Sequence, residues 1–371
     1  MEYLKLFSSH TDYEEYVTGG AMVKPNVSYC EDVKDVHYNP IHDYNQDYFT
    51  TVALEDGTIS FTPLNSNVIS YSIDNGNTWV VGNSVNVVNG DSVMWKGTMT
   101  PQLYNGIGKF DATSNFEVQG NTMSLLYGDD FKNQLSLEGK GYCFYNLFRN
   151  STKLISSENL SLLATTLADG CYGYMFYNCT NLTSTPELPA TTLASGCYVN
   201  MFSNCTSLTS APELPATALV DGCYIAMFNG CTSLTFAPQL PATTLASNCY
   251  AGMFARCTSL TSAPELLATT LAESCYNGMF GGCTGLTSAP ELPATTLASN
   301  CYASIFGGCT SLNYIKAMFT TTPSSTYTSN WVNGVASNGT FVKNSAATWN
   351  PEEVRGVNGV PTNWTVETAS E

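Results

Sequence analysis

The chain has 371 residues, which is long enough for two or three domains and a large core. Only 12% of the residues are charged, and the formal net charge is −17. Such a surface repels phosphate backbones, and no Lys/Arg cluster offsets it, so we expect no nucleic-acid binding. We also expect no membrane insertion, because no run of 18 apolar residues exists.

Residues 1–50 form a segment of their own in the sequence, without a repeat. Residues 1–10 lack an apolar region and a small-residue cleavage site, so we expect no Sec-type signal peptide. The stretches 25–32 and 36–40 resemble a leader of virion and surface-appendage proteins of phages that infect Bacteroidales. This resemblance implies that residues 1–50 attach the chain to other virion proteins. Four residues here are of metal-binding types, but their spacing fits no standard zinc finger, so we predict no metal site: Cys30, His37, His42 and Asp43.

Residues 51–122 have the pattern of a small all-β, sandwich-like domain. Turn signals such as Asp74-Asn75-Gly76 separate alternating or β-branched runs. The runs are 59–62, 68–73, 79–81 and 85–88. We expect residues 123–141 to cap the N-terminal end of the repeats that follow.

Residues 142–316 contain seven copies of a repeat with a period of 26 residues, the first of them degenerate. Each copy opens with Cys-Tyr-x-x-Met-Phe-x-x-Cys, whose fixed positions fall on one arc of a helical wheel and predict a short helix with one buried face. The following Leu-Thr-Ser-Ala-Pro-Glu-Leu-Pro predicts an extended segment, because proline stops a helix. One helix and one strand per copy predict an α/β solenoid of the leucine-rich-repeat class.

The unit resembles the BspA-like leucine-rich repeats of Bacteroidetes surface proteins. Cys197 takes the place of the isoleucine in that family's pattern and Met201 that of the alanine, whereas Phe202, Cys205 and Leu208 match directly. The proline-rich strand departs from the β-branched strand that is usual in the family. The resemblance implies a solenoid that works in adhesion.

The cysteines and phenylalanines of the repeat are predicted to form a structural ladder. We expect free, buried thiols that pack as small apolar residues, in preference to disulfides or a zinc site, for which no C-x-x-C spacing exists. The ladder comprises Cys171, Cys179, Cys197, Cys205, Cys223, Cys231, Phe176, Phe202, Phe228, Phe254, Phe280 and Phe306.

Six tyrosines, from Tyr172 to Tyr302, form a further column. We expect a packed ladder with its hydroxyls at the rim, and the alternative is an aromatic strip for sugars. After the repeats, residues 317–371 are predicted to be a C-terminal cap in which Trp331, Trp349 and Trp364 seal the last apolar face.

Nothing in the sequence points to an enzyme. The three histidines lie outside the repeats, and no catalytic or phosphate-binding motif is present, so we expect no catalytic residue and no cofactor. The variable x positions lie opposite the buried face and are the candidate ligand-binding residues, namely Tyr177, Asn200, Asn229 and Arg256. Their variation has a plain alternative explanation, since exposed positions drift. Their small, nearly uncharged surroundings suit a neutral glycan or a protein partner.

Together these features predict a phage virion appendage, of the tail-fibre or head-fibre type, that is made in the host cytoplasm and binds the host surface. The alternatives are a BspA-like bacterial cell-surface adhesin and a purely structural virion decoration. A homo-oligomer is compatible with each of these roles.

Overall fold

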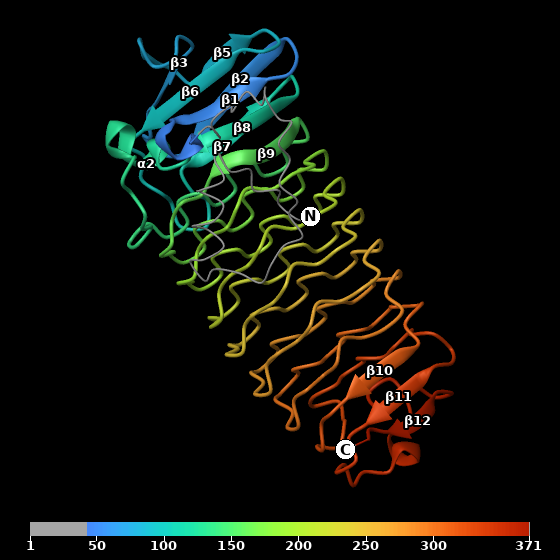
Figure 1. Ribbon diagram of the computed structural model, residues 1–371. Coiled ribbons are helices and arrows are strands. Elements are labelled where there is room, and N and C mark those ends of the chain that lie inside the picture. The colour runs from blue at the N-terminus through green and yellow to red at the C-terminus, as the bar shows by residue number, and fades with distance from the viewer. Residues whose placement is uncertain (1–42, 371) are drawn as a thin grey trace, which may run out of the picture. The chain divides into compact units, whose positions relative to one another are not determined.

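The computed structural model describes residues 43–370, so most of the predicted attachment segment lies outside the described residues. Strands dominate the regular structure, and the helices are few and short. In Figure 1 a β-rich region (blue to green) leads into the repeats, and three short strands (orange to red) lie at their C-terminal end. The core is continuous from Phe49 to Trp364.

Two sheets form the N-terminal region. One has the strand order β4-β3-β6-β1-β8-β9 and the other β5-β2-β7. All neighbours are antiparallel except β8 and β9, which are parallel. The strands are β1 (Phe49–Ala53), β2 (Gly57–Pro63), β3 (Ile69–Ser72), β4 (Val80–Val81), β5 (Ser84–Val87), β6 (Ser92–Gly97), β7 (Gly108–Ala112), β8 (Phe116–Asn121) and β9 (Leu154–Ser161).

Aromatic side chains carry this core into the repeats. Phe110 has its ring centroid 5.3 Å from that of Trp95 and 5.9 Å from that of Phe148, which belongs to the first repeat. Phe148 in turn stacks on Phe176 of the second repeat at 5.3 Å. Because β9 also lies in the first repeat and pairs with β8, both the sheet and the core pass directly into the repeats.

Residues 43–370 contain one short α-helix and three 3-10 helices. They are η1 (Tyr44–Gln46), α2 (Ser124–Tyr127), η2 (Gly128–Asp130) and, near the C-terminus, η3 (Pro351–Val354). The segment 123–141, predicted as a cap, contains α2 and η2 and buries Phe131 and Leu137 completely.

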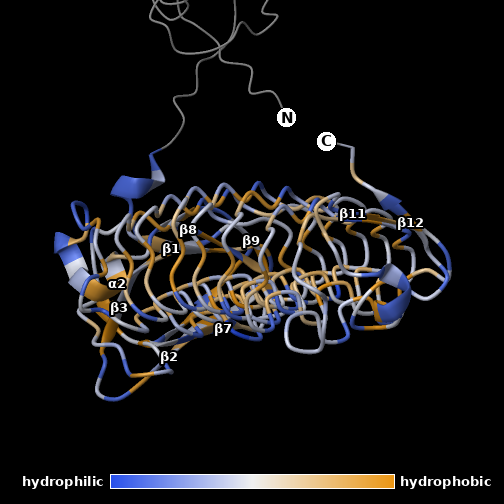
Figure 2. Ribbon diagram, turned by 90° about the horizontal axis from the view of Figure 1, so that it is seen from below, coloured by the Kyte–Doolittle hydropathy of each residue, from blue (hydrophilic) through white to orange (hydrophobic). Residues whose placement is uncertain are grey.

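The 26-residue repeat is plain in the structure, where equivalent aromatic rings of successive copies stack in columns. The phenylalanine rings from Phe176 to Phe306 lie 5.2–6.0 Å apart, with interplanar angles of 3–10°. Apolar segments run along the whole length of the repeats in Figure 2. Each copy therefore buries its apolar side chains against its neighbours, as a stacked repeat must.

The prediction of one helix per repeat is wrong. The segment that opens each copy consists of successive four-residue turns, in which every second N–H bonds to the carbonyl three residues back, as Met175 does to Tyr172. The intervening N–H groups bond to the next copy, as Phe176 does to Met201. Every fourth residue, such as Tyr174 and Asn178, has a positive φ, which an α-helix does not allow.

The proline-rich half of each copy also pairs less than a strand would. Its contacts with the neighbouring copy are isolated bridges, such as Ser210 with Phe236, and single hydrogen bonds, such as Thr235 N–H to Thr209 O at 3.3 Å. Pairing stops there because Pro212 and Pro238 have no N–H to donate.

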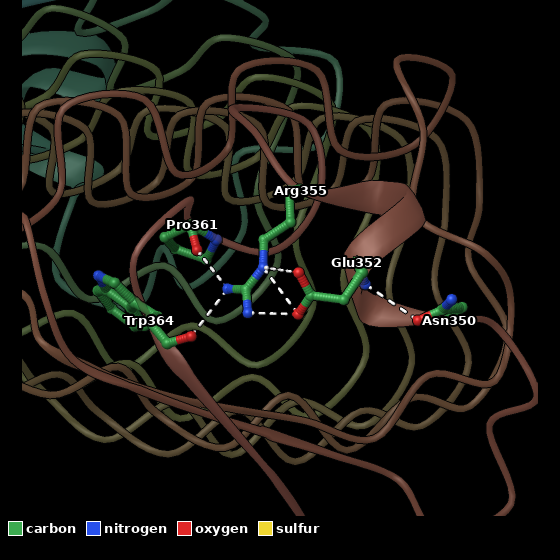
Figure 3. Close-up of polar contacts among 5 residues, drawn as sticks. All are labelled: Asn350, Glu352, Arg355, Pro361 and Trp364. Atoms are coloured by element: carbon green, nitrogen blue, oxygen red, sulfur yellow. Dashed lines mark hydrogen bonds and ion pairs between the residues drawn. The ribbon is translucent and has the colours of Figure 1, made fainter.

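The C-terminal end carries a parallel three-stranded sheet of β10 (Tyr314–Ala317), β11 (Thr340–Lys343) and β12 (Thr365–Thr368). Trp331, Trp349 and Trp364 are buried there, and Trp331 lies 6.3 Å from Phe306 at the end of the phenylalanine column. Arg355 connects the last loop to η3, as Figure 3 shows. Its guanidinium donates to the carbonyls of Pro361 (2.9 Å) and Trp364 (2.8 Å) and forms an ion pair with Glu352.

Candidate functional site

The cysteines of the repeats are packing residues. All thirteen cysteines of the described residues are buried and free, in two columns. In the second column each thiol donates to a phenylalanine carbonyl of the preceding copy, as Cys231 does to Phe202 at 3.1 Å. Burial raises the pKa of Cys179 and Cys231 to about 12, so these thiols stay protonated and unreactive at neutral pH.

The tyrosine column is likewise part of the core. The rings from Tyr172 to Tyr302 are 0–2% exposed and stack at 5.7–5.9 Å. The alternative of a sugar-binding strip is therefore wrong for this column. The prediction that the hydroxyls lie at the rim is also wrong for the first and last tyrosines of the column. The hydroxyls of Tyr172 and Tyr302 are buried and have no hydrogen-bond partner among the described residues.

The residues left for recognition are the outward side chains of the four-residue turns, a surface that we call the turn face. The structure divides the four predicted site residues among different parts of it. Asn229 and Arg256 come together at one depression, Tyr177 belongs to a group of tyrosines nearer the N-terminus, and Asn200 lies in neither.

Glycines form the depression on the turn face. Its volume is about 530 Å³, and Gly278, Gly281, Gly282 and Gly307 contribute no side chain to its floor. Its other lining residues are mostly small or polar: Asn229, Ala255, Arg256, Ser304, Asn330 and Asn333. The floor is therefore backbone, which offers hydrogen bonds rather than an apolar contact.

Arg256 is the unusual residue at this depression. It is exposed, it forms no ion pair with any described residue, and its φ is +62°, in a region that larger side chains rarely adopt. The depression thus has one free positive charge and otherwise neutral walls, which is suited to hydroxyl and carbonyl groups of a ligand.

The group around Tyr177 consists of five tyrosines in a row, which we call the tyrosine ridge. Successive ring centroids are 4.6, 5.5, 5.2 and 5.4 Å apart, at interplanar angles of 46–62°. The ridge comprises Tyr104, Tyr142, Tyr145, Tyr174 and Tyr177. Tyr104 is 60% exposed, and the other four are partly exposed.

Arg149 lies against this ridge. Its guanidinium is 5.3 Å from the ring centre of Tyr174 and 5.1 Å from that of Tyr177, within cation–π distance of both. Burial raises the pKa of Tyr145 to about 12 and, together with a hydrogen bond to Tyr104, that of Tyr142 to about 12. The phenols of Tyr142 and Tyr145 are therefore neutral at physiological pH.

Sequence reasoning found one member of the ridge and missed four. Tyr142 and Tyr145 lie in the degenerate first copy. Tyr174 lies at a position where later copies have smaller residues, and Tyr104 comes from the N-terminal β region. The one available signal was the excess of tyrosine at x positions of the first two copies, where Tyr145, Tyr174 and Tyr177 occur close together.

Within residues 43–370 no group of three or more His, Cys, Asp and Glu side chains is placed to hold a metal ion. Three of the four metal-type residues near the N-terminus, Cys30, His37 and His42, lie outside the described residues. No helix in the described part of the chain has both the length and the hydrophobicity needed to cross a membrane. No match to this chain is found among models of protein families, curated proteins or solved structures.

Proposed function

We propose that this protein is a non-enzymatic phage virion appendage, in which a leucine-rich-repeat solenoid of the BspA-like type presents its turn face to a glycan or protein on the host surface. Residues 1–50 attach it to other virion proteins. Four-residue turns stand where the sequence predicts a helix, and their outward side chains differ from copy to copy.

One observation carries this proposal: the division of each copy into an inner part that is constant and an outer part that varies. The Cys, Tyr, Met and Phe side chains beneath the turns are 0–2% exposed in copy after copy. The outward positions between them change from Tyr177 to Asn229 to Gly281. A stack of this kind keeps its fold while its surface diversifies, which is a property useful for recognition.

The location is tested by mass spectrometry of purified virions. The proposal expects peptides of this chain to copurify with capsid proteins through a density gradient, and antibody against the repeats to label intact particles. Detection of the chain only in the envelope fraction of bacterial cells would favour the bacterial adhesin instead.

Recognition is tested by replacing Tyr177, Asn200, Asn229 and Arg256 together by alanine. We expect binding of the purified protein to host cells to fall while the melting temperature stays constant, because none of these side chains belongs to the buried columns. The matched control replaces exposed residues of the opposite half, Thr209, Ser210 and Glu213, and should bind as the wild type does. Loss of binding in the control alone would move the site to that side.

A further inference from the structure

The tyrosine ridge has the properties of a built binding surface. Glycines make room for its rings: a Cβ atom at Gly170 would lie 2.5 Å from the ring of Tyr142, and one at Gly173 would lie 2.6 Å from the ring of Tyr145. The rings of Tyr142 and Tyr145 therefore lie against the backbone of the second copy, in space that a larger side chain at either glycine would occupy.

The backbone conformation of three ridge tyrosines also indicates a binding surface. Tyr104, Tyr142 and Tyr174 have φ angles of +59°, +60° and +54°, which are strained for bulky side chains. At the position of Tyr174 later copies have Asn200 and Ala226, which are smaller. Strained residues that their surroundings hold in place are concentrated at functional sites.

Hydrogen-bonding groups flank the rings. The Arg149 side chain donates to Asn146 Oδ1 at 3.3 Å, and most of its five N–H donors have no partner among residues 43–370. Asn150 lies beside Tyr177, because its N–H bonds to the Tyr177 carbonyl at 2.8 Å, and its Oδ1 accepts from Asn178 at 3.2 Å. Aromatic rings thus stand beside amide and guanidinium groups.

We propose that the tyrosine ridge, with Arg149, Asn150 and Asn178 beside it, binds a neutral oligosaccharide chain. The apolar C–H face of a pyranose packs against a tyrosine ring, and its equatorial hydroxyls reach the donors and acceptors on either side. A row of tilted rings at similar spacing offers successive contacts to successive sugar units. This inference rests on the proposed adhesive function and assigns its ligand class and its place on the turn face.

Charge argues against an acidic polymer as the occupant. The chain has a formal net charge of −17, and a polyanion would be repelled before contact. The one cation of the ridge, Arg149, has its charge stabilised by two ring faces. A protein partner is the competing occupant, since Tyr and Arg are also frequent in protein interfaces.

The test measures binding of the full chain to neutral hexaoses of glucose, mannose, galactose and xylose by isothermal titration calorimetry, with polygalacturonate as the acidic probe. We expect at least one neutral hexaose to bind. The double variant Tyr174→Ala, Tyr177→Ala should weaken that binding by about tenfold or more, because it removes two adjacent aromatic contacts. Tyr104→Ala, which removes an exposed ring from a loop, should weaken it several-fold.

The matched control is Thr209→Ala, Ser210→Ala on the exposed proline-rich half, which should keep wild-type affinity, and all variants should keep the wild-type melting temperature. Binding of no neutral hexaose, binding of polygalacturonate alone, or an equal loss in the control would overturn the inference.

Binding to Bacteroidales cells separates this inference from the proposed adhesive function. If the tyrosine variant binds cells as well as the wild type does, the saccharide site is wrong and adhesion stands. If hexaoses bind but cells do not, the saccharide site stands and host attachment is wrong. If periodate treatment of the cells leaves attachment intact and protease abolishes it, the partner is a protein and the saccharide site is wrong.

Discussion

Raising the pH from 8 to 10 should unfold the repeats. Burial raises the pKa of Cys249 and Cys301 to about 11 and that of Cys179 and Cys231 to about 12, and the remaining described thiols shift in the same direction. In the unfolded chain the pKa of the same groups is near 9. The unfolded state therefore binds fewer protons above that pH, so stability is complete below pH 9 and is lost as the pH rises towards 11.

The expected loss is large because so many thiols act together. At pH 10 ionisation of one thiol stabilises the unfolded chain by about 1.4 kcal/mol relative to a protonated thiol. Thirteen thiols that unfold together contribute on the order of 18 kcal/mol, which exceeds the roughly 5–15 kcal/mol of total stability that is typical of a domain. Disulfide-bonded cysteines would contribute nothing over this range.

The assay is urea denaturation followed by circular dichroism at pH 7, 8, 9 and 10, in the presence of a mild reductant. The variant Cys231→Ala is the control: it should lose less stability between pH 8 and 10 than the wild type, by about the share of one thiol, 1.4 kcal/mol. A free energy of unfolding that stays constant from pH 8 to 10 would show that the thiols do not titrate on unfolding, and that the reading of free, buried cysteines is wrong.

The other predictions concern packing, the C-terminal cap and attachment. Phe228→Ala, in the middle of the phenylalanine column, should lower the free energy of unfolding by about 3–5 kcal/mol in urea denaturation, and a loss below 1 kcal/mol would contradict a rigid column. Arg355→Ala should cost about 1–3 kcal/mol, because the partly buried carbonyls of Pro361 and Trp364 lose their donor. Glu352→Gln, which breaks only an exposed ion pair, should cost less than about 1 kcal/mol, and equal losses would argue against this account. A chain starting at Asp47 should keep its circular dichroism spectrum yet fail to enter particles, and normal incorporation would exclude residues 1–46 as the attachment segment.

The repeat period and the buried columns were predictable from the sequence, because a stack places equivalent residues one above another. The turns were misread as helices because fixed residues at i, i+1, i+4, i+5 and i+8 fit a period of four as well as one of 3.6. A second feature of the sequence distinguishes a period of four from one of 3.6. Positions such as Gly196, Asn200 and Asn204 recur every fourth residue, and Gly and Asn are the residues that most readily adopt a positive φ.

The tyrosine ridge was not predictable in the same way. It joins a loop of the N-terminal β region to the first two copies, and the packing of that loop depends on a close backbone approach at Gly106, where a Cβ atom would lie 2.3 Å from the Tyr145 carbonyl oxygen. No periodicity in one segment reports such a contact, which only the folded chain brings about.

The hydrogen bonding of the turns explains which side chains of this face are free to vary. Half of the N–H groups close a turn and half reach the next copy, so the outward side chains contribute little to stability and are free to change. One position in every four is restricted, because its φ is positive and favours Gly, Asn or another small residue. In the repeats only Tyr142, Tyr174 and Arg256 place a large side chain there among the described residues. Two of these belong to the tyrosine ridge and one to the glycine-floored depression. The backbone strain that these side chains impose thus coincides with the two places on the turn face that we propose as candidate ligand sites.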